Sequence, residues 1–163
     1  MISLEFFTHT YDPIMNDARG NCAIRGCRIS DLHQVAEIEK VSFPDPYDKA
    51  TFLRFLVWER KGFLVAEDQG TILGYVIASS GHGSGLIASI AVSPNYKQKG
   101  IGSTLMRAAL DYLIGKVREV KLQVNVRNTA AIGLYIKFSF REVGRLHGYY
   151  PNGDDALLMT RQS

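Results

Sequence analysis

Residues 86–126 alternate between strand and helix patterns, and this alternation constrains the fold more than any other feature of the chain. Residues 86–92 and 120–126 have the apolar character of strands, and residues 99–113 between them repeat apolar side chains at helical spacing. Two strands that are joined through a helix by short connections pair in parallel, through a right-handed crossover. The segment therefore predicts an α/β fold with one central sheet.

The patterns before and after this segment extend the predicted sheet. Residues 22–27 predict a short strand, and residues 62–66 and 72–77 predict a hairpin around Asp68-Gln69-Gly70. We expect residues 81–85 to form a flexible link, and a helix over 129–138 to precede two final strands. The hairpin makes the sheet mixed, with helices on both faces.

Two helices are predicted between the first strand and the hairpin. We expect Ser30 to cap the first, whose apolar residues keep helical spacing: Leu32, Val35, Ala36 and Ile38. Pro44 and Pro46 then force a loop. The second helix places Phe52, Phe55 and Leu56 on one side.

Length and charge limit the organisation and the ligands. A chain of 163 residues predicts one domain, which we place at residues 21–163 after an N-terminal extension at residues 1–20. No apolar run reaches the ~18–20 residues of a membrane helix, and the N-terminus lacks a secretory pattern, so we expect a cytoplasmic protein without a membrane partner. The net charge of +3 suits a polyanionic small ligand and falls short of a nucleic-acid footprint. Two cysteines and four scattered histidines predict no metal site.

The turn between the strand at 86–92 and the next helix has the composition of an anion site. Gly100 and Gly102 lie where the chain enters the helix, and Lys97 and Lys99 add positive charge. Helix N-termini present unpaired N–H groups, and glycines let a phosphate approach the backbone. The turn lacks the Gly-Lys-Ser/Thr of a Walker loop and the three glycines of a dinucleotide fingerprint. A pyrophosphate is the ligand that it predicts, although two glycines at a helix start also serve packing alone.

Two ordered motifs resemble the GNAT superfamily of N-acetyltransferases. Lys97-x-x-Gly100-x-Gly102 resembles its pyrophosphate loop, with Lys in place of the usual Arg or Gln. Residues 128–135 resemble its Asn-x-x-Ala-x-x-x-Tyr segment, and Phe138-Ser139-Phe140 resembles its Gly-Phe ending, with Ser139 where glycine is usual. The resemblance covers about residues 22–161 and implies the GNAT fold with acetyl-CoA as co-substrate.

The resemblance also implies residue roles. The backbone at Ile90, Ala91 and Val92 and the side chain of Asn128 would bind the pantetheine arm. Tyr135 would protonate the departing thiolate; the alternative is a core tyrosine. The pyrophosphate would lie on the loop and first helical turn, made of Lys97, Gln98, Lys99, Gly100, Ile101, Gly102 and Ser103.

Two loops resemble those of protein N-terminal acetyltransferases, the RimI and NatA catalytic-subunit type. Residues 43–47 are similar to a Φ-Pro-x-x-Tyr loop, and residues 149–156 to a Tyr-Tyr-x-x-Gly-x-Asp-Ala run. By this resemblance the loops would enclose the first residues of a peptide. The substrate-binding residues would then be Phe43, Tyr47, Gln123, Tyr149 and Tyr150.

The general base and the substrate class are less constrained. Asp45 matches a glutamate of the NatA-type loop and is our leading base, whereas Gln123 cannot accept a proton. Transfer through water by Tyr47 or Tyr150, or to His147, stays open. We expect transfer to a protein N-terminal α-amine. The alternatives are a GNAT that acetylates lysine or a small amine, and a non-catalytic acyl-CoA-binding module. Whether the chain acts alone, as a homo-oligomer or on an auxiliary subunit also stays open.

Overall fold

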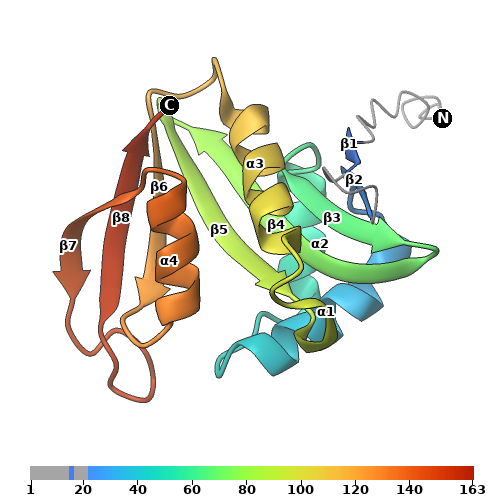
Figure 1. The fold of residues 1–163 in the computed structure, drawn as a ribbon, viewed down its shortest axis with the longest axis horizontal. Coiled ribbons are helices and arrows are strands. Elements are labelled where there is room, and N and C mark those ends of the chain that lie inside the picture. The colour runs from blue at the N-terminus through green and yellow to red at the C-terminus, as the bar shows by residue number, and fades with distance from the viewer. Residues whose placement is uncertain (1–14, 17–21) are drawn as a thin grey trace, which may run out of the picture.

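The computed structural model describes residues 15–16 and 22–163, and within them eight strands form one mixed sheet (Figure 1). The strand order is β1-β2-β3-β4-β5-β6-β8-β7, antiparallel except between β5 and β6. The strands are β1 (Met15–Asn16), β2 (Ala23–Gly26), β3 (Phe63–Asp68), β4 (Thr71–Gly81), β5 (Ser84–Val92), β6 (Glu119–Asn125), β7 (Arg141–Leu146) and β8 (Ala156–Gln162). The helices are α1 (Leu32–Ser42), α2 (Lys49–Trp58), α3 (Ile101–Leu113) and α4 (Thr129–Lys137).

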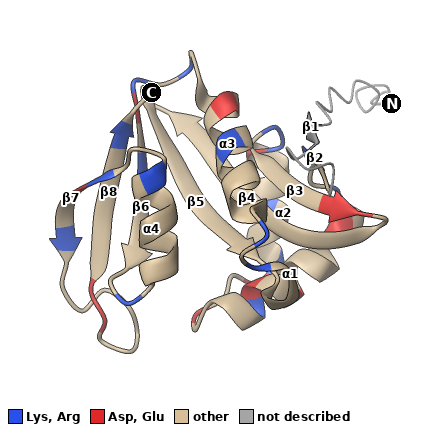
Figure 2. Cartoon of the chain, viewed as in Figure 1, with Lys and Arg blue, Asp and Glu red and all other residues tan. Residues whose placement is uncertain are grey.

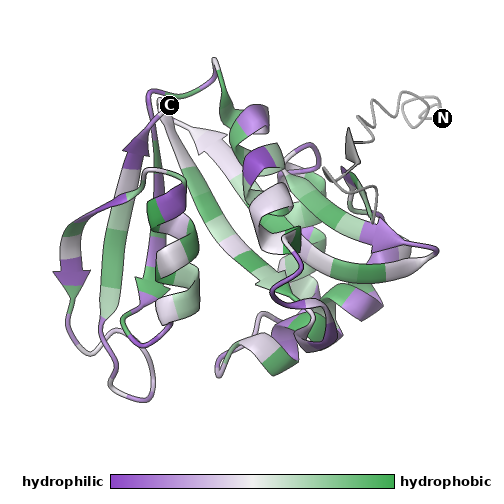
Figure 3. Ribbon diagram, viewed as in Figure 1, coloured by the Kyte–Doolittle hydropathy of each residue, from purple (hydrophilic) through white to green (hydrophobic). Residues whose placement is uncertain are grey.

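Helices cover both faces of the sheet, as predicted (Figure 1). The apolar residues of α3 pack on one face, with half-buried residues of α4 beside them. The apolar residues of α1 and the buried Phe52 of α2 pack on the other face. Figure 3 shows apolar stretches along the central strands, where both helical layers cover them. No helix in the described part of the chain is long and apolar enough to cross a membrane.

The parallel pair β5 and β6 separates after a short common stretch. Ser84, Gly85 and Leu86 pair with residues 119–121, and the pairing of β5 with β6 ends there. Figure 1 shows the two strands spreading apart toward the C-terminal end of β5. The sheet therefore has a gap beside residues 87–92, next to the turn that leads into α3.

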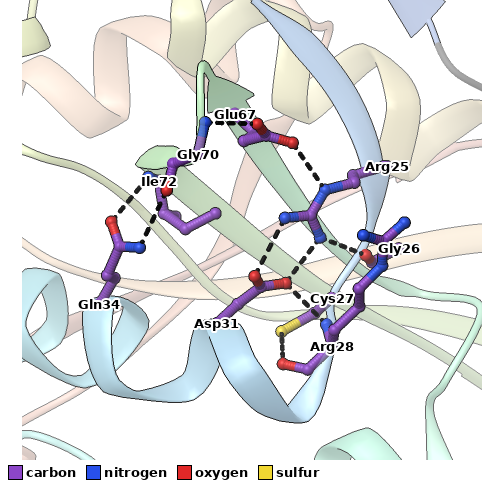
Figure 4. Close-up of polar contacts among 9 residues, drawn as sticks. All are labelled: Arg25, Gly26, Cys27, Arg28, Asp31, Gln34, Glu67, Gly70 and Ile72. Atoms are coloured by element: carbon purple, nitrogen blue, oxygen red, sulfur yellow. Dashed lines mark hydrogen bonds and ion pairs between the residues drawn. The ribbon is translucent and has the colours of Figure 1, made fainter.

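The start of α1 differs from the sequence prediction, because Asp31 rather than Ser30 organises it. A single 3-10 turn, Ile29–Asp31, precedes α1, and Asp31 Oδ2 accepts a hydrogen bond from the Arg28 amide at 2.8 Å. Arg25 binds the same carboxylate with both terminal nitrogens, at 2.6 and 3.0 Å, and donates through Nε to Glu67 (Figure 4). A buried ion pair thus fixes α1 against β2 and β3.

The segment at 81–85 also differs from the prediction. The strands β4 and β5 pair up to Gly81 and Ser84, so only His82 and Gly83 form the turn. Both have positive φ, 51° and 79°, as in the tight turns that suit twisted hairpins. The other predicted strands and helices are confirmed to within a few residues. The predicted extension at residues 1–20 lies outside the described residues except for β1, which pairs with β2.

Candidate active site

The first turn of α3 has the features of an anion site. Gly100 stands at the N-cap with φ 88°, and among the described residues no side chain caps the helix and no acid lies in its first turn. The amides of Ile101, Gly102 and Ser103 have no acceptors within the helix, and they lie at its positive end. A phosphate group would therefore find three N–H donors without competition from a carboxylate.

The space around the two glycines also fits a pyrophosphate. A Cβ atom at Gly100 would meet nothing within 4 Å, and one at Gly102 would lie 3.6 Å from Leu134 and 3.7 Å from Val92. Lys97 and Lys99 are exposed, and Figure 2 shows basic residues in the turn before α3. The turn before α3 thus has an accessible backbone and two positively charged side chains, and it lies next to the gap between β5 and β6. A cavity of about 150 Å³, lined by Arg107, Leu110 and Arg161 among others, lies toward the opposite end of α3 and is not part of this site.

The two predicted residues of α4 lie at different depths. Asn128 is exposed at the N-cap, and its Oδ1 accepts a hydrogen bond from the Ala131 amide at 3.1 Å. Tyr135 is buried in the α3–α4 core, with its ring 6.0 Å from that of Phe140. Burial, and then the charge of Tyr150, raises the pKa of Tyr135, so its hydroxyl keeps its proton at neutral pH. Tyr135 is thus a core residue whose protonated hydroxyl lies within electrostatic range of Tyr150.

The two tyrosine loops lie close together. Burial raises the pKa of Tyr47, followed by the charges of Glu39 and Tyr149. Burial likewise raises the pKa of Tyr150, followed by the charges of Tyr149 and Tyr47. Such mutual effects require short separations. The loop at 43–47 and the turn at 149–150 therefore lie close to each other, at the end of the molecule where β5 and β6 spread apart (Figure 1).

The turn between β7 and β8 is held rigidly by its own residues. The rings of Tyr149 and Tyr150 meet edge to face at 5.2 Å. Asp155 accepts the Gly148 amide at 2.9 Å and bonds His147, as expected of a turn carboxylate. Asp154 instead accepts side-chain amides from Asn125 and Asn152. These bonds link the turn to the end of β6.

Gln123 and Asp45 are both exposed. On β6, Leu122 and Val124 point into the core beneath α3, so Gln123 points to the opposite face of the sheet. Asp45 lies on the same loop as Tyr47, between two prolines. Phe43, at the start of this loop, packs partly against the core beneath α1.

One residue of the site region was missed by the sequence prediction, namely Glu39. It is 2% exposed, and its carboxylate accepts the Tyr47 amide at 3.0 Å and the hydroxyl of Tyr75. Burial raises its pKa, and the hydrogen bonds from Tyr47 and Tyr75 oppose that effect. The signal was present in the sequence: Glu39 follows Leu32 by seven residues and so occupies the apolar stripe of α1.

The chain is similar to known acetyltransferases. The model of the Acetyltransferase (GNAT) family matches residues 32–140. The chain is 34% identical over 151 residues to an N-alpha-acetyltransferase of Sulfurisphaera tokodaii, covering 84% of this chain and 90% of the relative. It is 36% identical over 141 residues to the N-alpha-acetyltransferase RimI of Mycobacterium tuberculosis, covering 82% and 88%.

Solved structures share the fold. Ard1 from Thermoplasma volcanium superposes with a TM-score of 0.83 at 27% identity, over 87% of this chain and 97% of that one. NAA60 of Arabidopsis thaliana, solved in complex with acetyl-CoA, has a TM-score of 0.74 at 26% identity, over 87% and 99%. The family model covers more than half of the chain and includes the separated strands, the uncapped helix and Tyr135. The chain belongs to the GNAT family of acetyltransferases.

Proposed function

We propose that this chain transfers the acetyl group of acetyl-CoA to the N-terminal α-amine of a protein or peptide, by direct attack in a ternary complex. One observation carries the proposal: the loop at 43–47 and the turn at 149–150 lie close together beside the gap between β5 and β6 (Figure 1), and Tyr150 is within electrostatic range of Tyr135. Relatives named N-alpha-acetyltransferase and RimI support the same substrate class.

In this proposal the cofactor lies in the gap between β5 and β6. The amides from Gln98 to Ser103 bind the pyrophosphate, with Lys97 and Lys99 contributing positive charge. The edge of β5 that β6 leaves unpaired, at Ile90, Ala91 and Val92, pairs with the pantetheine arm. The side-chain amide nitrogen of Asn128 donates to the same arm, since its oxygen is held by the Ala131 amide. When bound, acetyl-CoA supplies the activated thioester.

Tyr135 acts on the leaving group. Its hydroxyl is protonated at neutral pH and can donate to the departing thiolate, but burial, which raises its pKa, makes it a weaker acid. Because a thiol has a pKa of about 8.5, the thiolate needs little help, and Tyr135 contributes a moderate factor rather than an absolute requirement.

The acceptor amine loses its proton on the opposite side of the site. A terminal α-amine has a pKa of about 7.7–8.0, against about 10.4 for lysine, so the base has roughly 3–4 kcal/mol less to supply for the former. Asp45 fills that role in this proposal. Gln123 orients a water molecule or the peptide group, and Phe43 and the three loop tyrosines enclose the first residues. His147, already bonded to Asp155, is the alternative acceptor through water.

Mass spectrometry of a peptide library tests the proposal. The peptides vary in their first residue, each carries an internal lysine, and they are incubated with the protein and acetyl-CoA. We expect the mass of one acetyl group on the α-amine only. The Gly100→Glu variant is the matched control, because a carboxylate at the anion site repels the pyrophosphate. Acetylation confined to lysine would transfer the assignment to a lysine acetyltransferase. Acetyl-CoA binding without any product would indicate a small-amine substrate or a binding module.

A further inference from the structure

The buried carboxyl group of Glu39 joins four parts of the protein. It projects from α1, accepts the amide of Tyr47 on the loop at 43–47, and accepts the hydroxyl of Tyr75 on β4. That hydroxyl is also 2.9 Å from Ser89 Oγ on β5. Both carboxyl oxygens thus bind neutral donors, and the group lies in the core beneath α1. Its burial costs free energy that the two hydrogen bonds offset.

The same residue fixes both ends of the loop at 43–47. The backbone carbonyl of Glu39 accepts the amide of Phe43 at 3.0 Å, and its side chain accepts the amide of Tyr47 at 3.0 Å. Pro44 and Pro46 have no N–H to donate. Two of the N–H groups that remain in this short loop therefore donate to Glu39.

The ring of Tyr47 is fixed in turn by aromatic packing. It lies 5.6 Å from Phe55 and 6.1 Å, edge to face, from Phe52. With its backbone held by Glu39 and its ring held by α2, Tyr47 has a defined position close to Tyr149. A movement of the Tyr47 backbone would change the width of the entrance between the loops.

We propose that Glu39 is a positioning residue for the acceptor peptide, which holds the backbone of Tyr47 and so sets the spacing between the two tyrosine loops. This inference rests on the proposed substrate role of Tyr47. Glu39 itself is 2% exposed and its two oxygens are occupied, so it does not receive the proton of the amine. This role requires an acceptor oxygen within hydrogen-bond distance of the Tyr47 amide, and it does not require the negative charge.

Two conservative variants separate the effect of side-chain length at position 39 from the effect of charge. Glu39→Asp keeps the charge but shortens the side chain by one methylene group, which takes the oxygen out of hydrogen-bond distance of the Tyr47 amide. Glu39→Gln loses the charge but keeps an acceptor oxygen at full length. Its amide group can donate to Tyr75, because either Tyr75 or Ser89 can be the donor between their hydroxyls.

The experiment is steady-state kinetics of α-amine acetylation, with peptide and acetyl-CoA each varied at saturating levels of the other. We expect Glu39→Asp to raise the peptide KM about fivefold, the equivalent of one ordinary hydrogen bond, with the acetyl-CoA KM unchanged. We expect Glu39→Gln to stay within about twofold of the wild-type peptide KM, because its hydrogen bond to Tyr47 is kept.

Asp31→Asn is the control for general destabilisation. Asp31 is also a buried carboxylate at α1, but it lies at the opposite end of the helix. We expect Asp31→Asn to lower the melting temperature and leave the peptide KM unchanged. If it raises the peptide KM as much as Glu39→Asp does, Glu39 has only a structural role.

Other outcomes overturn the inference in distinct ways. A loss of kcat in Glu39→Gln, with Glu39→Asp active, would make Glu39 a proton acceptor. An unchanged peptide KM in both variants would show that the loop is positioned without Glu39. Absence of α-amine acetylation by the wild-type protein would remove the proposed function itself, and the inference with it.

Discussion

Alanine at Gly100 and at Gly102 should change stability in opposite directions, although the two glycines are only two residues apart. Gly100 has a φ of 88°, in the left-handed region, and a Cβ there would meet nothing within 4 Å. The cost of Gly100→Ala is therefore conformational and not steric. A residue with a Cβ atom in that region costs about 1–2 kcal/mol.

Gly102 lies inside the first turn of α3, where a Cβ makes ordinary contacts at 3.6 and 3.7 Å. Alanine is favoured over glycine in a helix by up to about 1 kcal/mol. For a domain of this size, 1 kcal/mol corresponds to about 2–4 °C in melting temperature. We therefore expect Gly100→Ala to melt about 2–8 °C below the wild type, and Gly102→Ala to melt up to about 4 °C above it.

Thermal unfolding followed by circular dichroism, with and without acetyl-CoA, measures both effects. Bound ligand should still raise the melting temperature of Gly102→Ala, since the anion site keeps its amides. A Gly100→Ala protein that melts like the wild type would refute the left-handed conformation at the N-cap. A Gly102→Ala protein that melts as low as Gly100→Ala would show that the contacts with Leu134 and Val92 are tighter than described.

Three further predictions concern the proton transfers and the ion pair. Tyr135→Phe should keep acetyl-CoA affinity and lower kcat by about tenfold, because a thiolate needs little acid assistance; unchanged turnover would leave Tyr135 as a core residue alone. Asp45→Asn should flatten the rising limb of the pH–rate profile, and an unaltered profile would remove Asp45 as the base. Burial acts to raise the pKa of Asp31, but the hydrogen bonds from Arg25 and the Arg28 amide outweigh it and lower the pKa below 3.8. The ionised carboxylate of Asp31 therefore contributes fully to stability above about pH 4, and this contribution is lost as the pH falls further. Below about pH 4, the melting temperature of Asp31→Asn should therefore depend less on pH than that of the wild type.

The features that sequence predicted well are those determined by neighbouring residues. The turn into α3 depends on glycines and lysines within a few positions, and the loop at 43–47 depends on its two prolines. Their positions, and the strands and helices around them, could be predicted from local pattern. That Tyr47 and Tyr149 lie close together in space could be expected only from the resemblance to a family.

The features that were predicted wrongly or missed depend on contacts between residues that are far apart along the chain. Ser30 is a good capping residue, but Arg25 and Glu67 place the carboxylate of Asp31 at that helix start instead. The turn at His82 and Gly83 follows from the pairing of two long strands. The role of Glu39 depends on Tyr75, 36 residues away, so a charged residue in an apolar stripe signals a buried contact without naming its partner.

The separation of β5 and β6 makes the sheet an incomplete one. Three residue pairs join the strands, and beyond them each strand has an unpaired edge inside the molecule. A pantetheine arm placed along Ile90, Ala91 and Val92 would act as a missing strand, so that binding the co-substrate completes the secondary structure of the protein. Amides on the facing edges of β5 and β6 should then exchange slowly with solvent in the complex and faster without it. In that sense the ligand is part of the fold as well as a reactant.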